Sequence, residues 1–335
     1  MKHVLFSLLL IPFLAGSAWG FDGTLHLMLD NDFIVRTDDD YTSGLGLGWV
    51  SAPADNWQDV EGFTWLADFN ERLPLVNSRR GRTSGVTVDL VHLMYTPDNI
   101  KVAEPDPNDR PYAGVIFLGL GAHQLDEKRA DEWEFIFGHV GPDTGVDDFQ
   151  AWVHDVIGAN EPQGWEHQVG NEMLVNLSYD RRWRLLQTPL ARQTWGSDLI
   201  AGNLIMLGNM RTSLVADLTW RVGYALPYGF GRTSTRLATE GYQAPCEAEP
   251  TWGGHASLGL AGEAVLHDVT LDGRLFAEDN IQISREPFIF RLISSANFHY
   301  QRLYLGFQFI TASPTFKESS HYHHYARFSI GWRFY

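Results

Sequence analysis

The strongest constraint on the fold of this chain is an alternation of apolar and polar or small residues that recurs in segments of about ten residues. It is clearest in the last segment of the sequence. A period of two places alternate side chains on opposite faces of a β-strand. One face of this segment carries Phe328, Ile330, Trp332 and Phe334, and the other carries Arg327, Ser329, Gly331 and Arg333. A final strand with so much apolar area on one face is typical of a membrane-spanning β-barrel.

The same alternation occurs earlier in the chain, in segments 24–30, 133–139, 173–179, 258–266 and 303–309. A further segment begins near Tyr41, where leucine and tryptophan alternate with Gly44, Gly46 and Gly48. Glycine on an inner face suits a crowded lumen or a sharply bent wall. Counting such segments predicts about a dozen strands.

After the N-terminal region, the sequence has no uninterrupted apolar stretch of the length that a spanning helix needs. Only helices and closed barrels satisfy the backbone in lipid, so the expected fold is all-β: a single antiparallel transmembrane β-barrel of about 12 strands. Aromatic residues make up 13% of the chain, enough for girdles at both membrane interfaces. The 44% of hydrophobic residues fits a soluble secreted β-sandwich equally well, so that fold remains an alternative.

The first twenty residues have the pattern of a cleaved secretory signal. Basic Lys2 and His3 precede an apolar run from Val4 to Ala15, and the small-x-small triplet at 18–20 follows. The alternative is a membrane anchor, but the run is shorter than the roughly 20 residues that an anchor requires. We therefore expect a signal peptide at 1–20 and one barrel domain at 21–335.

The net charge of −16 argues against a nucleic-acid partner, because phosphate binding needs clustered lysine and arginine. The single cysteine, Cys246, lies in a stretch rich in proline and glutamate and forms neither an intrachain disulfide nor a zinc motif. We interpret it as an incidental loop thiol.

Two long polar stretches, 97–111 and 141–172, are predicted to be loops, and by barrel convention long loops face outside. Within the second, residues 147–157 can form a short amphipathic helix that carries His154. The sequence has 13 histidines, and a lone histidine is more often structural than catalytic.

Carboxylates are concentrated around the first loop, where Asp30-Asn31-Asp32 is followed by the run Asp38-Asp39-Asp40. Calcium is bound by six to eight such oxygen ligands, so this loop, whose carboxylates include Asp32 and Asp40, is a candidate metal site. The alternative is a solvated acidic loop.

Four motifs occur in the order found in the outer-membrane lipid A 3′-O-deacylase family (LpxR-like). They are Asn31-Asp32, Asp40-Tyr41-Thr42-Ser43-Gly44, Asp109-Arg110-Pro111-Tyr112-Ala113-Gly114, and Gly141-Pro142-Asp143 followed by His154 and Trp165. The first half of the chain resembles this family densely, and the second half only through generic barrel strands. The resemblance implies a 12-stranded barrel whose active site lies near the outer rim, between the wall and a helix in an extracellular loop.

The resemblance also implies roles for individual residues. His154 would be the general base that activates water, Asp32 would bind calcium, and Asn31 and Thr42 would line the same site. The family has a carboxylate about six residues after its histidine, whereas this chain has Asn160 there, next to Glu161. The resemblance therefore does not say which group orients His154.

The chemistry of these residues agrees with a calcium-dependent esterase that removes the 3′-acyloxyacyl chain of lipid A. A histidine has an ordinary pKa of about 6.5 and can accept a proton from water at neutral pH. Calcium can polarise the ester carbonyl, and Asn31 can donate to the oxyanion. A site at the outer rim meets the lipopolysaccharide of the outer leaflet, and Lys101 and Arg110 are candidates for binding its phosphates, or else ordinary loop charges.

Two other functions remain open. An outer-membrane phospholipase would need a catalytic serine, for which Ser43 is the candidate near the site, although the sequence has no Gly-x-Ser-x-Gly motif. A narrow pore or structural barrel would bind cations at its acidic loop without catalysis.

Overall fold

The computed structural model of the chain describes residues 22–32, 40–60, 63, 82–188, 194–230 and 251–334. The expected signal peptide, the carboxylates Asp38 and Asp39, and Cys246 lie outside the described residues, as does the side chain of Asp40.

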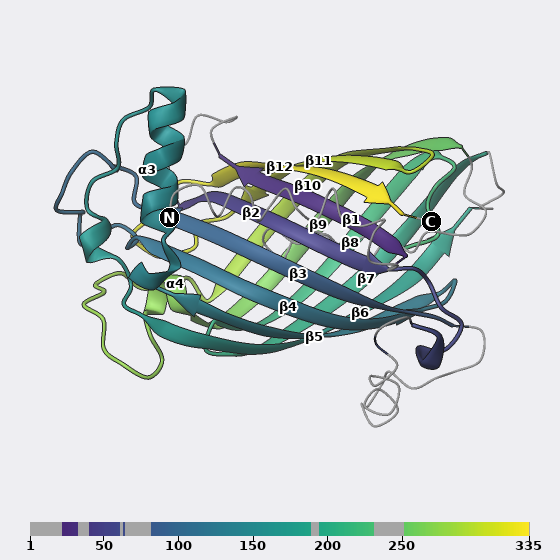
Figure 1. The fold of residues 1–335 in the computed structure, drawn as a ribbon, viewed down its shortest axis with the longest axis horizontal. Coiled ribbons are helices and arrows are strands. Elements are labelled where there is room, and N and C mark those ends of the chain that lie inside the picture. Colours follow the sequence, from purple (N-terminus) through teal and green to yellow (C-terminus); the bar gives the residue numbers. More distant parts are fainter. Residues whose placement is uncertain are drawn as a thin grey trace.

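Twelve antiparallel strands form a closed barrel in which each strand pairs with its neighbours in sequence and β1 pairs with β12 (Figure 1). This confirms the predicted fold and excludes a two-sheet sandwich, because the single sheet closes on itself. The strands are β1 (Gly23–Asn31), β2 (Asp40–Ser51), β3 (Thr83–Thr96), β4 (Ala113–Leu125), β5 (Arg129–Val140), β6 (Glu172–Gln187), β7 (Trp195–Gly208), β8 (Arg211–Tyr224), β9 (Trp252–Asp268), β10 (Phe288–Tyr300), β11 (Leu303–Ala312) and β12 (His323–Arg333).

The connections contain short helices: η3 (Trp57–Asp59), η4 (Pro142–Thr144), α3 (Val146–Ile157), η5 (Trp165–His167) and α4 (Val269–Asp272). The helix α3 confirms the amphipathic helix predicted at 147–157. No helix among the described residues is long and apolar enough to span a membrane.

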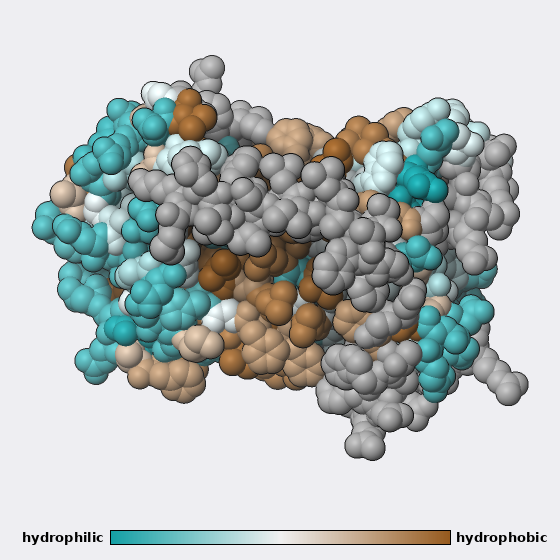
Figure 2. Space-filling view, viewed as in Figure 1, coloured by the Kyte–Doolittle hydropathy of each residue, from teal (hydrophilic) through white to brown (hydrophobic). Residues whose placement is uncertain are grey.

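The alternation read from the sequence gives the two faces of the wall. At the seam between β1 and β12, Leu29 pairs with Phe328, and these side chains are 44% and 42% exposed on the outer face. The next pair, Asp30 and Arg327, is buried in the lumen. Figure 2 shows the consequence on one face of the molecule, where apolar residues lie in the middle and hydrophilic residues at the two ends. Such an arrangement matches the hydrocarbon layer of a membrane.

Charged and polar side chains fill the lumen. The guanidinium of Arg327 donates two hydrogen bonds to the carboxylate of Asp30, at 2.6 and 2.7 Å. Further along the barrel, the carboxylate of Asp131 accepts hydrogen bonds from Arg82, Arg129 and Arg181. The inner-face glycines agree with this crowding. A Cβ atom added to Gly48 would lie 2.4 Å from Asp89 Oδ1.

The two ends of the barrel differ. We call the end that carries α3 and α4 the helix end, and the end where β1 begins and β12 stops the terminal end (Figure 1). The predicted loops at 97–111 and 141–172 are found at the helix end, as connections 97–112 and 141–171.

The expectation that all long connections share one end is wrong. The β2–β3 connection (52–82) and the β8–β9 connection (225–251) are long and belong to the terminal end, whereas β7 and β8 are joined at the helix end by residues 209–210 alone. The entropy of closing a loop grows slowly with its length, so barrel closure constrains connection lengths little.

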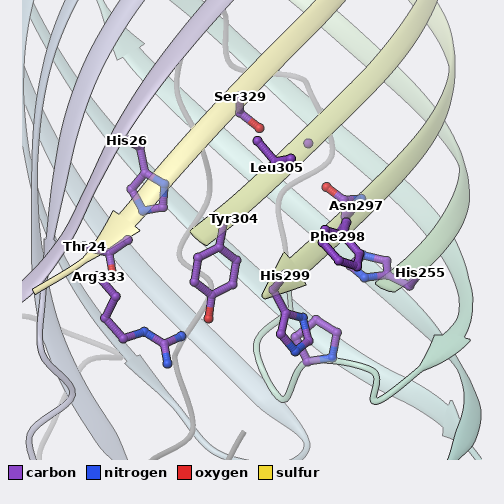
Figure 3. A pocket seen from close by; sticks show the side chains of 12 residues that line it. Thr24, His26, His255, Asn297, Phe298, His299, Tyr304, Leu305, Ser329 and Arg333 are labelled. Atoms are coloured by element: carbon purple, nitrogen blue, oxygen red, sulfur yellow. The ribbon is translucent and has the colours of Figure 1, made fainter. Parts of the chain in front are cut away.

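Near the terminal end, the lumen contains a small polar pocket (Figure 3). Its lining includes His26, His255, His299, Tyr304 and Arg333, which come from β1, β9, β10, β11 and β12. The Arg333 guanidinium lies 5.0 Å from the centre of the Tyr304 ring.

Candidate active site

The helix α3 packs against the outer face of the wall rather than over the lumen. Its Val146 and Phe149 share an apolar cluster with Met94 of β3, and the Phe149 ring lies 5.1 Å from the ring of His92. His92 and Met94 occupy the same face of β3 as the outward-facing Leu90. Residues on α3 therefore lie beside the membrane-facing side of β3.

Two of the sequence motifs hold this helix in place. The ring of Tyr112, from the third motif, lies tilted against that of Trp165 with the ring centres 4.7 Å apart, and its hydroxyl donates to the Gln163 carbonyl at 2.6 Å. Trp165 in turn donates from Nε1 to Oε1 of buried Gln150 on α3 at 2.7 Å. These contacts fix the position of α3 relative to the start of β4.

Two positions in the motifs require glycine, one because another side chain lies too close for a Cβ atom and one because of its backbone conformation. A Cβ atom at Gly114 would lie 2.7 Å from the Val146 Cβ, so a larger residue would push α3 off the wall. Gly141 has φ of +109°, a conformation that favours glycine, and its N–H donates to the Gly114 carbonyl at 3.0 Å.

His154 lies on the last turn of α3 and is half-buried. Its Nδ1 is 2.5 Å from the backbone carbonyl oxygen of Asn160. A carbonyl only accepts hydrogen bonds, so the proton of neutral His154 is on Nδ1 and the Nε2 lone pair is available to accept a proton. A backbone carbonyl thus accepts from His154 at the position where the family that the motifs resemble has a carboxylate.

Thr42 and Asp32 are brought together at the first loop. The Asp32 N–H donates to the Thr42 carbonyl at 3.3 Å, and the Asp32 side chain is fully buried. A β-bulge between Tyr41 and Ser43 shifts the register of β2 against β3. Thr42 is the extra residue of this bulge, and its hydroxyl lies 2.6 Å from the hydroxyl of Thr96.

Asn31 lies on the outer face of β1, on the same side as Leu29, and is half-buried. It pairs across the sheet with Ser43, whose hydroxyl donates to the Asp30 carbonyl at 3.2 Å.

Two of the segments that carry candidate residues contact the outer face of β3. Thr96, which contacts Thr42, is the last residue of β3, and Met94 and His92 on the same face contact α3. Thr42 and the first turn of α3 therefore contact the same outer face of β3 near the helix end, and His154 lies on the last turn of that helix.

Arg110 is placed elsewhere. It is 2% exposed, its guanidinium lies 4.5 Å from the centre of the Tyr95 ring, and it donates to the Thr270 hydroxyl of α4 at 3.0 Å. Tyr95 faces the lumen, so Arg110 ties the third motif to α4 above the lumen. Lys101, by contrast, is exposed in the 97–112 connection.

Asp109, the neighbour of Arg110, is a partly buried carboxylate that organises the 97–112 connection. It accepts hydrogen bonds from the backbone N–H groups of Asp98 at 2.8 Å and Arg110 at 2.7 Å. Burial raises the pKa of Asp109 from 3.8 to about 6, and this effect outweighs the two hydrogen bonds, which lower it.

The side chains near the first loop carry oxygen atoms of the types that bind a hard cation. Asp32 offers a carboxylate, Asn31 an amide oxygen and Thr42 a hydroxyl, which are the oxygen ligands that calcium takes. Within the described residues, no three His, Cys, Asp or Glu side chains gather as a metal site. A calcium ion here would complete its coordination with backbone oxygens and water, which is usual for this ion.

A family model described as "Outer membrane protein LpxR" matches residues 4–334. The chain belongs to the LpxR family. This confirms the resemblance seen in the motifs and makes the protein an integral β-barrel of the Gram-negative outer membrane.

The solved structure of LpxR from Salmonella typhimurium is similar to this barrel, with a TM-score of 0.72 and 17% identity over 93% of this chain and 100% of that chain. At that identity the likeness concerns the fold. The β-domain of the Bordetella autotransporter BrkA is more distant, at 9% identity and a TM-score of 0.43 over 93% of this chain and 97% of that one. Among curated proteins, none matches the chain.

Two contacts of the candidate residues could not be predicted from the sequence. Thr96 carries no motif, and only the bulge in β2 brings it to Thr42. The contact with the Asn160 carbonyl has no signature in the sequence, because every residue has a backbone carbonyl. The only available signal was the missing carboxylate at position 160, which indicated that another group must orient His154.

Proposed function

We propose that this LpxR-family barrel is a calcium-dependent esterase that hydrolyses the 3′-acyloxyacyl chain of lipid A. The observation that carries the proposal is the orientation of His154. Its Nδ1 is held by the Asn160 carbonyl on a helix packed against the wall, which leaves Nε2 to act as a base. The family supplies the reaction class.

In this proposal His154 accepts a proton from a water molecule at Nε2, and that water attacks the ester carbonyl. Asn31, on the outer face of β1, donates its side-chain N–H to the developing oxyanion. Asp32 and Asp40 would hold calcium, with Thr42 lining the site. When bound, calcium supplies positive charge that polarises the ester carbonyl.

The surroundings of the site support a lipid substrate. Trp152 and Val156 of α3 are 43% and 64% exposed, so the helix presents apolar side chains beside the membrane-facing wall. An ester within the outer leaflet can reach such a site sideways from the bilayer. Lys101 is the candidate for binding a lipid A phosphate, because it is exposed, whereas the buried position of Arg110 favours a structural role.

The test is mass spectrometry of lipid A after incubation with the purified protein in detergent, with calcium or with a chelator. We expect loss of one acyloxyacyl unit only with calcium, and no product with His154→Ala. His321→Ala, which removes an exposed histidine in the β11–β12 connection, is the matched control and should retain full activity. Unchanged lipid A with the wild-type protein and calcium would refute the proposal.

A phospholipase mechanism predicts a different result. It needs Ser43 as nucleophile, whereas the Ser43 hydroxyl donates to the Asp30 carbonyl. We expect Ser43→Ala to retain most of the activity. A loss as severe as that of His154→Ala would favour the serine mechanism.

A further inference from the structure

The membrane-facing wall contains an apolar groove of about 510 Å³ over β1, β12, β11 and β10. Its sides are outward-facing side chains such as Leu29, Phe307 and Phe328, which are 44%, 37% and 42% exposed. Its floor includes Gly306 and Ser329, small residues of the strands themselves. In Figure 1 these strands lie next to one another along one side of the barrel.

The groove is continuous with the candidate active site through β1. Leu27 and Leu29 line the groove, and Asn31 follows on the same face of the same strand. Four residues of a strand span about 14 Å, so the groove extends from beside Asn31 toward the middle of the membrane. The cross-strand partners follow the same order, with Leu27 opposite Ile330 and Leu29 opposite Phe328.

We propose that this groove binds one acyl chain of the lipid whose ester bond lies at Asn31 and His154. This inference rests on the proposed function, since it assigns the groove to the substrate of that site. A hydrocarbon chain is the occupant that the lining favours, because the sides are apolar and the groove opens into the membrane. Its direction fits as well, because a lipid with its ester at the rim has its chains pointing toward the bilayer centre.

Filling the groove tests this assignment. Leu305 lies in the groove and is 43% exposed, and Leu305→Trp adds bulk there. Leu218 on β8 is 42% exposed on the same membrane-facing surface but outside the groove lining, so Leu218→Trp is the matched control. Tryptophan is tolerated on lipid-facing surfaces, and heat-dependent mobility on gels checks that both variants fold.

The first readout does not depend on activity. A saturated fatty acid with a photoreactive diazirine near its methyl end is added to the full-length protein in detergent with chelator, and the labelled peptides are mapped. We expect labels concentrated on β1, β11 and β12, reduced about fivefold or more by Leu305→Trp and unchanged by Leu218→Trp. Labels spread evenly around the barrel, or labels in the groove that Leu305→Trp does not reduce, would overturn the inference.

The second readout compares deacylation of lipid A species with long and short acyl chains. We expect Leu305→Trp to lower activity on the long-chain species several-fold more than on the short-chain species, with no such difference for Leu218→Trp. A wild-type protein inactive on every lipid A would refute the proposed function, while the labelling result would still decide whether the groove binds an acyl chain.

Discussion

At the scale of single residues, Asp109 links pH to stability. Its folded pKa of about 6 lies above the ordinary value of 3.8, so the folded chain binds this proton more tightly than the unfolded chain. The charged form therefore costs stability above about pH 6, and the free energy of unfolding rises as pH falls from about 6 toward 4. The difference between 3.8 and about 6 corresponds to about 3 kcal/mol, and solvent screening of this partly exposed carboxylate reduces the effect to the order of 2 kcal/mol.

We expect Asp109→Asn to flatten this pH dependence, because an amide does not titrate in this range. Urea unfolding in detergent at pH 4.5 and pH 7.5 measures the difference. Asp55→Asn, at an exposed position in the β2–β3 connection, should keep the wild-type dependence. An Asp109→Asn protein with the wild-type slope would show that another group is responsible.

For His154, the residue could be proposed from the sequence, whereas its hydrogen-bond partner could not. The motif predicts a role for this histidine, but the partner of its Nδ1 is a backbone carbonyl, which no side-chain pattern reveals. This gives a direct expectation: Asn160→Ala should keep activity within about twofold, because the carbonyl remains. Lipid A deacylation rates measure the effect. A loss of about tenfold or more, the size typical for removal of an orienting group, would mean that the Asn160 side chain itself acts.

At the scale of elements, the strands could be predicted well because a period of two is a direct consequence of strand geometry. The bulge in β2 could not. Strict alternation from the inward-facing Gly44 places Thr42 inside and Tyr41 outside, whereas Tyr41 donates to the lumen carboxylate of Asp30 and Thr42 contacts Thr96. A bulge is set by cross-strand partners, which the local sequence does not specify.

The helix α3 has glycines at both ends with nearly equal geometry. Gly145 and Gly158 have φ of 67° and 70°, and a Cβ atom at either would meet nothing within 4 Å. Alanine at each should therefore cost a similar amount of stability, about 1 kcal/mol. Gly158, however, begins the turn that leads from His154 to the Asn160 carbonyl.

We therefore expect Gly158→Ala to lower the deacylation rate several-fold, while Gly145→Ala leaves it near that of the wild type. Gly158→Asn should restore much of the activity, because asparagine tolerates the left-handed conformation better than alanine. Thermal unfolding of the three variants provides the common reference. Equal activity losses at Gly145 and Gly158 would indicate a general loosening of α3 rather than a misplaced His154.

At the scale of the whole molecule, the closed barrel followed from the alternating segments and the absence of apolar helices. The packing of its lumen required the structure, because only the register shows which charges meet. Pairs such as Arg327 with Asp30, and Arg211 with Glu263 at 2.8 Å, fill the interior with bonded side chains. We expect no ion conductance in planar bilayers, measured beside a known porin. Stable conductance steps would favour the pore alternative.

The seam between β1 and β12 is where the two ends of the sheet close the barrel, and it contains the buried pair Asp30 and Arg327. Tyr41 also donates to Asp30 at 2.9 Å, so the carboxylate joins β1, β2 and β12. Arg327→Met would leave that carboxylate buried without its cation, which typically costs about 3–5 kcal/mol.

Arg327→Met combined with Asp30→Asn should recover most of this loss, because the amide oxygen is neutral and still accepts from Tyr41. The temperature at which the folded barrel loses its gel mobility measures all variants, with Arg302→Met in the exposed β10–β11 turn as the control. If Arg327→Met loses its folded mobility at the same temperature as the wild type, the seam is held by its backbone pairing alone. If the double variant is as unstable as the single one, the loss comes from the missing arginine packing rather than from the buried charge.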